Sequence, residues 1–249
     1  MSSQRWAVFL DVDNTLLVDG DVSPGIRAAV RAAQQKGHLF FLNTGRSASF
    51  LPQVVREAVD WDGVVAGIGS DVTYGDRILF EKHASRASLK RVADYFLPLG
   101  QGVILEGRLA TFSIGPNNWG VPSVGDWQTF ISLPDPQVSK ITFDEVLTDE
   151  ECALLQPDFT PIRHPDYTEA SLAGCNKATG MEVVLRALDI PVSRSIAMGD
   201  SHNDWDMLDA AGISVAMGNA DPATKARCHV VSPDACDDGV AWAIRKYLL

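Results

Sequence analysis

The chain lacks a long hydrophobic run. Its first apolar stretch, residues 6–10, ends at Asp11, which makes it too short for the hydrophobic region of a signal peptide. Nowhere do about 18 apolar residues follow one another, as a membrane-spanning helix requires. We therefore expect a cytoplasmic protein that does not span a membrane.

Cysteine is scarce, and positive charge is in deficit. The four cysteines form no C-x-x-C pair, which argues against a disulfide framework or a zinc site and favours reduced thiols. Asp and Glu number 32 against 21 Lys and Arg, a formal net charge of −11. Because binding to nucleic acid or to an anionic membrane needs a basic face, we expect neither as a partner.

The two ends of the chain alternate between strand and helix patterns. Residues 6–10 and 39–42 are short apolar runs, typical of strands buried on both faces. Between them, Ser23 as N-cap, Pro24 as first residue and Gly37 just beyond the end bracket a helix. Towards the C-terminus we expect helices over residues 176–188, 204–212 and 240–248, and strands at 195–198, 213–217 and 230–231. This order predicts an α/β protein with a Rossmann-like parallel sheet as its core.

The middle of the chain has a different pattern. A hairpin over residues 72–80 is followed by helices near 85–96, 126–131 and 149–155, interleaved with short strands. Two of these strands are expected to turn at Glu106-Gly107, and others lie at 138–143 and around Pro161 and Tyr167. We interpret residues 83–172 as an inserted α+β domain, and residues 1–82 and 173–249 as a discontinuous core.

Polar clusters follow three of the expected core strands. In open parallel sheets, ligands bind at the carboxyl ends of the strands, so these clusters are expected to meet. A fourth candidate, Lys177, stands at a helix start, where a cation opposes the helix dipole and an anion in front of it would offset the cost. The three clusters are D-V-D-N-T at 11–15, T-G-R at 44–46 and G-D-S-H-N-D at 199–204.

Three acidic side chains at one edge of a sheet would repel one another. At about 4 Å and an effective dielectric constant near 20, each like-charged pair costs roughly 4 kcal/mol. A divalent cation is the simplest remedy. Oxygen ligands without a nearby Cys/His set favour Mg²⁺ over Zn²⁺.

The ordered motifs resemble those of the haloacid dehalogenase (HAD) superfamily. The matching segments are D-V-D-N-T-L-L, N-T-G-R-S, a lone lysine and G-D-S-H-N-D-x-x-M-L. The chain is most similar to Cof-type phosphatases with a C2B cap. The stretch between Asp13 and Thr44 is too short for a cap, whereas that between Thr44 and Lys177 leaves room for one, where the inserted domain is predicted.

The resemblance implies a role for each motif residue. Asp11 would be the nucleophile, and Asp13 would be the general acid and then the general base. Side chains of Asp11 and Asp200 and the backbone carbonyl of Asp13 would ligate Mg²⁺, with Asp204 ligating it or holding a bound water. The groups that hold the phosphoryl oxygens would be Thr44, the Gly45 N–H, Lys177 and Asn203, and Arg46 would contact the substrate.

One position departs from the family, because Asn14 stands where glycine is usual. Asparagine tolerates a left-handed backbone better than most residues, so the turn is expected to survive. The expected function is Mg²⁺-dependent hydrolysis of small phosphorylated metabolites, such as sugar phosphates, through an aspartyl-phosphate. Two alternatives stay open: a sugar phosphomutase or other phosphotransferase, and a non-catalytic regulatory protein on the same scaffold. The sequence gives no indication of the oligomeric state.

Overall fold

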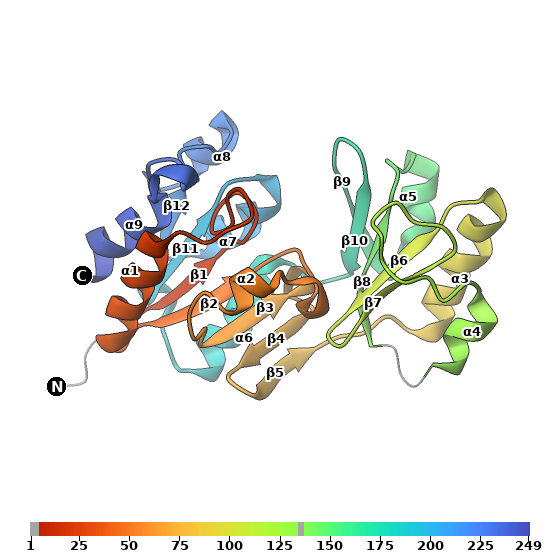
Figure 1. Ribbon diagram of the computed structural model, residues 1–249, viewed down its shortest axis with the longest axis horizontal. Coiled ribbons are helices and arrows are strands. Elements are labelled where there is room, and N and C mark those ends of the chain that lie inside the picture. Colours follow the sequence, from red (N-terminus) through yellow and green to blue (C-terminus); the bar gives the residue numbers. More distant parts are fainter. Residues whose placement is uncertain (1–4, 134–136) are drawn as a thin grey trace. The chain divides into compact units, whose positions relative to one another are not determined.

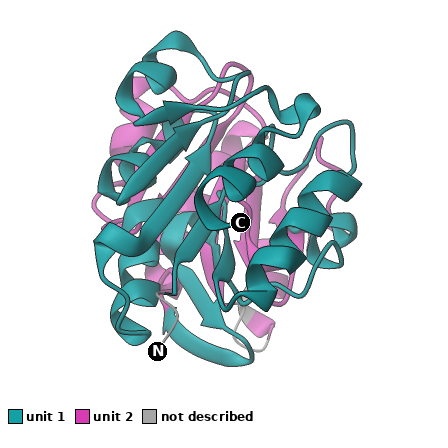
Figure 2. Cartoon of the chain, turned by 90° about the vertical axis from the view of Figure 1, so that its left-hand side faces the viewer, with its two compact units in different colours: residues 1–45, 51–80, 176–249 teal, residues 46–50, 81–175 magenta. Residues whose placement is uncertain are grey.

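The computed structural model describes residues 5–133 and 137–249, and its chain divides into two compact units. Residues 1–45, 51–80 and 176–249 form the core unit, and residues 46–50 and 81–175 form the cap unit (Figure 2). A short segment directly after Gly45 thus belongs to the cap unit, although its neighbours on both sides belong to the core.

The core unit is built on an eight-stranded sheet (Figure 1). Across the sheet, the strands are β13 (Val230–Val231), β12 (Ile213–Ala216), β11 (Ser195–Gly199), β1 (Ala7–Leu10), β2 (Leu39–Asn43), β3 (Gly63–Ala66), β4 (Asp71–Tyr74) and β5 (Arg77–Glu81). The strands from β13 to β3 are parallel, and β4 is antiparallel to β3. The predicted Rossmann-like parallel core is confirmed.

Helices cover both faces of this sheet. One face packs against α1 (Pro24–Gln35) and α9 (Gly239–Leu248), and the other against α6 (Lys177–Ala187) and α7 (Trp205–Ala210). The Ser23 hydroxyl accepts a hydrogen bond from the Ile26 N–H, as the N-cap prediction requires. The short helices α2 (Gln53–Arg56) and α8 (Pro222–Arg227) complete the unit. No helix in the described residues is both long enough and apolar enough to cross a bilayer.

The cap unit is an antiparallel sheet with helices on one face. Its strand order is β7 (Thr111–Ile114), β6 (Val103–Gly107), β8 (Val138–Phe143), β10 (Thr168–Leu172) and β9 (Phe159–Arg163). Residues of α3 (Arg86–Phe96), α4 (Trp127–Ser132) and α5 (Asp149–Leu155) share one hydrophobic cluster with alternate residues of these strands. An α+β cap unit is therefore present, as predicted.

One expected turn of the cap is misplaced by the sequence analysis. Glu106 and Gly107 lie inside β6, and the chain turns at residues 108–110. Glu106 stays in the strand because its carboxylate accepts a hydrogen bond from the Thr142 hydroxyl (2.7 Å) and lies 3.2 Å from the Lys140 ammonium. Both partners come from the adjacent strand β8, which local sequence does not reveal.

Candidate active site

Three core strands end at the same edge of the sheet. In the parallel register, Leu10 of β1 lies opposite both Leu42 of β2 and Met198 of β11. The ladder continues one residue further, because the Asp11 N–H donates to the Met198 carbonyl (3.0 Å). The polar clusters that follow β1, β2 and β11 are thus brought together, as the sequence predicts.

Lys177 is the centre of this site. It is the first residue of α6, its side chain is fully buried, and its helix is capped by Asn176, whose side chain accepts from the Thr179 N–H. The Lys177 ammonium donates to Asp11 Oδ1 at 2.6 Å and to Asp204 Oδ1 at 2.5 Å. A solvated surface lysine is therefore excluded, and one buried cation links two motif loops.

Asp204 organises the loop after β11. Its Oδ1 accepts from Lys177, and its Oδ2 accepts from the backbone N–H groups of Asp200 (3.0 Å) and Ser201 (3.1 Å). A β-carbon on Gly199 would lie 2.4 Å from Asp204 Cγ, so only glycine leaves room for this carboxylate. Asp204 is fully buried and fixes the turn that presents Asp200.

The start of α6 is held by Asn43, whose role the sequence analysis did not assign. The Asn43 amide donates to the Lys177 carbonyl (3.0 Å), and the carbonyl of the next residue, Thr44, accepts from the Ile68 N–H (3.2 Å). Ile68 has a φ of 56°, an uncommon backbone for a β-branched residue. The available signal was a polar residue, Asn43, at the last position of a buried strand.

Two glycines let α6 approach the sheet closely. A β-carbon on Gly69, which has a φ of +86°, would lie 2.0 Å from the Asn176 carbonyl oxygen. A β-carbon on Gly180 would lie 2.3 Å from Val65 Cγ1. Both contacts fix the end of the helix that carries Lys177, so these glycines position the buried ammonium.

The donor set fits a divalent cation. Carboxylate oxygens of Asp11, Asp200 and Asp204 all lie within 4.8 Å of one another, and Lys177 supplies the ammonium that contacts two of them. Burial raises the pKa of the Asp11 carboxyl well above its usual range, and Asp204 raises it further, while Lys177 opposes both. Burial and the Asp204 carboxylate also raise the pKa of Asp200 to about 6. Three carboxyl groups thus lie together with a single ammonium group, and a hard divalent cation bound by their oxygens would balance the remaining negative charge.

The lysine responds to the same charges in the opposite direction. Burial alone would lower the pKa of Lys177, but the Asp11 and Asp204 carboxylates raise it above its usual range. Lys177 therefore carries its positive charge at neutral pH.

The remaining predicted residues are placed as follows. Asp13 is half-buried on the loop after β1, and Asn14 beside it has a φ of 56°, the left-handed backbone expected of the residue in place of glycine. Thr44 is buried, and its N–H donates to the Val65 carbonyl (2.9 Å). Asn203 Oδ1 lies 3.5 Å from the Lys177 ammonium, while Gly45 is half-buried directly after Thr44.

Arg46 belongs to the cap unit, whereas the other predicted site residues belong to the core unit. Its guanidinium donates to the Phe50 carbonyl (3.3 Å) and lies 5.5 Å from the centre of the Phe50 ring. The same segment is bound to the cap by Ser49, whose hydroxyl donates to the Gly107 carbonyl (2.7 Å).

Comparison with known proteins agrees with this geometry. The profile of the haloacid dehalogenase-like hydrolase family matches residues 8–244, which include both the core and the cap. The chain belongs to this hydrolase family. Its fold, a parallel α/β core with an inserted cap, is accordingly that of the family.

Three relatives show how far the similarity extends. A 5-amino-6-(5-phospho-D-ribitylamino)uracil phosphatase of Bacillus subtilis (strain 168) is 25% identical over 97% of this chain and 95% of its own length. A phosphoglycolate phosphatase of Methanoculleus marisnigri is 27% identical over 88% and 86%. The solved structure of a phosphatase of the haloalkanoate (HAD) enzyme superfamily from Bacteroides thetaiotaomicron is 26% identical, with a TM-score of 0.86 over 98% of this chain and 96% of that one.

The cap of this hydrolase holds a second buried charge cluster, which the sequence analysis missed. The Lys140 ammonium donates to Glu169 Oε2 (2.6 Å) and lies 3.2 Å from Glu106 Oε1, and His164 Nε2 lies 3.0 Å from Glu169 Oε1. Alternation along the strands puts Glu106, Lys140 and Glu169 on the sheet face opposite the helices. Glu106 is 2% exposed, and its Oε2 has no hydrogen-bond partner among the described residues.

Proposed function

We propose that this hydrolase removes phosphate from small phosphorylated metabolites, with Mg²⁺ bound and through an aspartyl-phosphate formed on Asp11. One observation carries the proposal: a fully buried lysine holds Asp11 and Asp204 at 2.6 and 2.5 Å, with the Asp200 carboxylate at the same strand ends. An acceptor carboxylate, a fixed cation and further acids in one place are the parts that phosphoryl transfer needs.

Asp11 and Asp13 divide the chemistry between them. In the first step an Asp11 carboxylate oxygen forms a bond to phosphorus while the bond from phosphorus to the ester oxygen breaks. Asp13, two residues further along the same loop, gives its proton to the departing oxygen. In the second step water attacks phosphorus, Asp13 takes up a proton from that water, and the bond to Asp11 breaks. Phosphate then leaves and both carboxyl groups return to their starting states.

Lys177 and its neighbours would hold the phosphoryl group. An ammonium has three N–H donors, and here they face Asp11, Asp204 and, at 3.5 Å, Asn203. The longest of these contacts is the weakest, so the donor facing Asn203 is the one that a phosphoryl oxygen would take. The Thr44 hydroxyl and the Gly45 N–H would bind the other phosphoryl oxygens.

Mg²⁺ would be held by the side chains of Asp11 and Asp200 and by the backbone carbonyl of Asp13. Asp204 has its oxygens engaged by Lys177 and two backbone N–H groups, which favours an indirect role through a bound water. When bound, the ion supplies the positive charge that lets carboxylates and a phosphate share one pocket.

The substrate class follows from what the relatives share. The phosphatases at 25% and 27% identity are named for a phosphoribitylamino-uracil and for phosphoglycolate, which have in common only a phosphate ester on a small molecule. We therefore assign the class of small phosphorylated metabolites, and sugar phosphates are the first members to test.

The test is release of inorganic phosphate from a panel of phosphorylated metabolites, with Mg²⁺ and without any acceptor alcohol or bisphosphate activator. We expect release that EDTA abolishes and added Mg²⁺ restores. Asp200→Asn should abolish it as well, whereas Asp206→Asn, an exposed acid on α7, is the matched control and should leave it intact. Full activity after exhaustive EDTA treatment contradicts the metal role. Turnover that requires an acceptor alcohol indicates a phosphotransferase, and a panel left untouched favours the non-catalytic alternative.

A further inference from the structure

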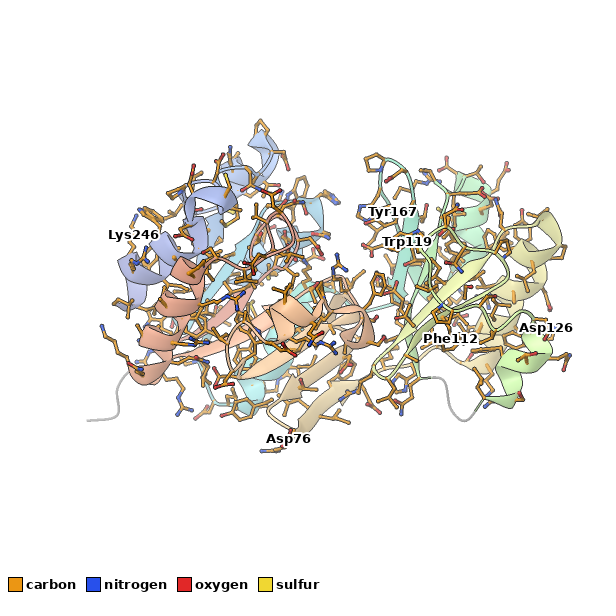
Figure 3. All side chains as sticks on the ribbon, viewed as in Figure 1. Asp76, Phe112, Trp119, Asp126, Tyr167 and Lys246 are labelled. Carbon is orange, nitrogen blue, oxygen red and sulfur yellow. The ribbon has the colours of Figure 1, made fainter. Side chains whose placement is uncertain are left out.

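The core sheet ends in an open edge at β5. In the part of the chain that the structure describes, β5 has a neighbour on one side only, β4 (Figure 1). Figure 3 shows Asp76 at the tip of the β4–β5 turn, pointing away from the sheet, so the turn does not fold back over the edge. An edge strand presents a row of unpaired N–H and C=O groups, which can pair with another strand.

The side chains of β5 are unusually apolar for such an edge. Ile78 is 53% exposed and Phe80 is 36% exposed, while Leu79 between them packs against the core cluster shared by the sheet and α6. Alternation therefore puts Ile78 and Phe80 together on the opposite face. This face carries two large apolar side chains in contact with solvent, on a strand that is free to pair.

The charges of β5 are complementary to the same strand running in the opposite direction. The strand reads Arg77-Ile78-Leu79-Phe80-Glu81, with a cation at one end and an anion at the other. If two copies pair antiparallel about Leu79, each Arg77 lies opposite the Glu81 of the other copy, and each Ile78 lies opposite a Phe80. Parallel pairing would instead put like charges beside each other.

We propose that β5 pairs antiparallel with the β5 of a second copy of this chain, joining two core sheets across a twofold axis. The charge arrangement favours a second copy of this chain as the partner. The charges of two β5 strands are complementary when the strands run antiparallel, and they repel when the strands run parallel. Within residues 5–133 and 137–249, Arg77 has no ion-pair partner, so its charge is available. Glu81 Oε2 accepts from Arg108 Nη2 (3.2 Å), which leaves its other oxygen for the Arg77 of the second copy.

The contact is short, so the association is weak. Five paired residues bury less than the roughly 1,200 Å² that specific, stable interfaces usually reach. We therefore expect a dimer that forms as the concentration rises through the micromolar range and above, and that dissociates on dilution.

Charge reversal provides a sharp test, read by sedimentation velocity over a concentration series. Arg77→Glu brings carboxylates of the two copies opposite each other, and Glu81→Arg does the same with guanidinium groups. Each variant alone should therefore self-associate roughly tenfold more weakly than the natural chain.

Mixing the two variants supplies the matched control. In a pair of one copy of each, the Arg77→Glu strand carries carboxylates at both ends and the Glu81→Arg strand carries guanidinium groups at both ends, so opposite charges face each other at each end. The mixture should thus form a heterodimer about as strongly as the natural chain dimerises, and more strongly than either variant alone. The double variant, in which Arg77→Glu and Glu81→Arg are combined, restores opposite charges at both ends, so it should dimerise like the natural chain. This recovery also shows that neither change prevents folding. Arg56→Glu, the same charge change at an exposed position on α2, should leave dimerisation unaltered.

Two results overturn the proposal. One is a natural chain that sediments with the mass of a single chain at every concentration up to about 1 mM, which would mean that β5 is unpaired or serves a different partner. The other is a dimer that neither reversal weakens, or a double variant that stays monomeric, because the contact would then lie elsewhere.

Discussion

Replacing Lys177 by Met should both destabilise the protein and make its stability depend strongly on pH. The substitution keeps the length and the apolar stem of the side chain but removes the ammonium that donates to Asp11 and Asp204. Two buried carboxylates would then face each other without their cation. Breaking a buried ion pair in this way costs about 3–5 kcal/mol.

The distances in the site give a similar magnitude. Oxygens of Asp11, Asp200 and Asp204 lie within 4.8 Å of one another, so each ionised pair repels by about 3 kcal/mol at an effective dielectric constant near 20. The alternative is to protonate one carboxyl at pH 7, which costs about 4 kcal/mol for a group whose ordinary pKa is near 3.9. Either route lowers the midpoint of thermal unfolding by roughly 10 °C.

The sign of the pH dependence follows from the raised pKa of the Asp11 and Asp200 carboxyls. In the folded Lys177→Met variant these groups bind protons more readily than in the unfolded chain, so lowering the pH favours folding. The unfolding free energy of the variant should fall short of that of the natural protein most at pH 7, and this difference should shrink as the pH falls towards about 4. Thermal unfolding at a series of pH values measures it.

Lys90→Met is the control, because Lys90 forms an exposed ion pair with Asp94. We expect it to change the unfolding free energy by less than about 1 kcal/mol at every pH. A Lys177→Met variant that unfolds within about 1 kcal/mol of the natural protein at pH 7, or with a deficit that does not change with pH, would refute the reasoning.

Two further substitutions test the loop after β11 and the cap cluster. Gly199→Ala puts a β-carbon 2.4 Å from Asp204 Cγ, so it should displace that carboxylate and lower kcat at least tenfold in the phosphate-release assay, and unchanged kcat would argue against the positioning role. Glu169 is buried, which raises the pKa of its carboxyl, but the Lys140 ammonium and the His164 hydrogen bond outweigh burial and lower that pKa to about 2. The ion pair with Lys140 should therefore stabilise the protein fully above pH 4.5 and lose its effect as the pH falls towards 2, so the gap in unfolding midpoint between the natural protein and Glu169→Gln should narrow over that range. A gap that stays constant from pH 6 to about pH 3 would show that Glu169 is not held ionised by Lys140.

Much of the core could be predicted from sequence because its signals are local. Short apolar runs mark buried parallel strands, and the position of each polar cluster after such a run places it at one edge of the sheet. Lys177 shows the same logic, since an unfavourable cation at a helix start indicates that something negative lies near it. In the structure its neighbours are the Asp11 and Asp204 carboxylates.

What the sequence did not reveal depends on contacts between distant segments. Asn43 acts on α6 through a hydrogen bond to a residue 134 positions away, and Gly69 is required by the approach of the Asn176 carbonyl. In the cap, Glu106 beside a glycine is typical of a turn, yet Thr142, 36 residues further on, holds it in a strand. Such partners become visible only when the strand order is known.

The central claim is that phosphorus passes through a covalent bond to Asp11. Rapid acid quenching during turnover of a sugar phosphate, followed by borohydride reduction, converts an aspartyl-phosphate into homoserine, which peptide mass spectrometry can locate. The account predicts homoserine at position 11 in the natural protein, and none at that position without substrate or in Asp11→Asn, which should also have lost turnover. Unmodified Asp11 in every sample while phosphate is being released, or an Asp11→Asn variant that keeps its turnover, would contradict it.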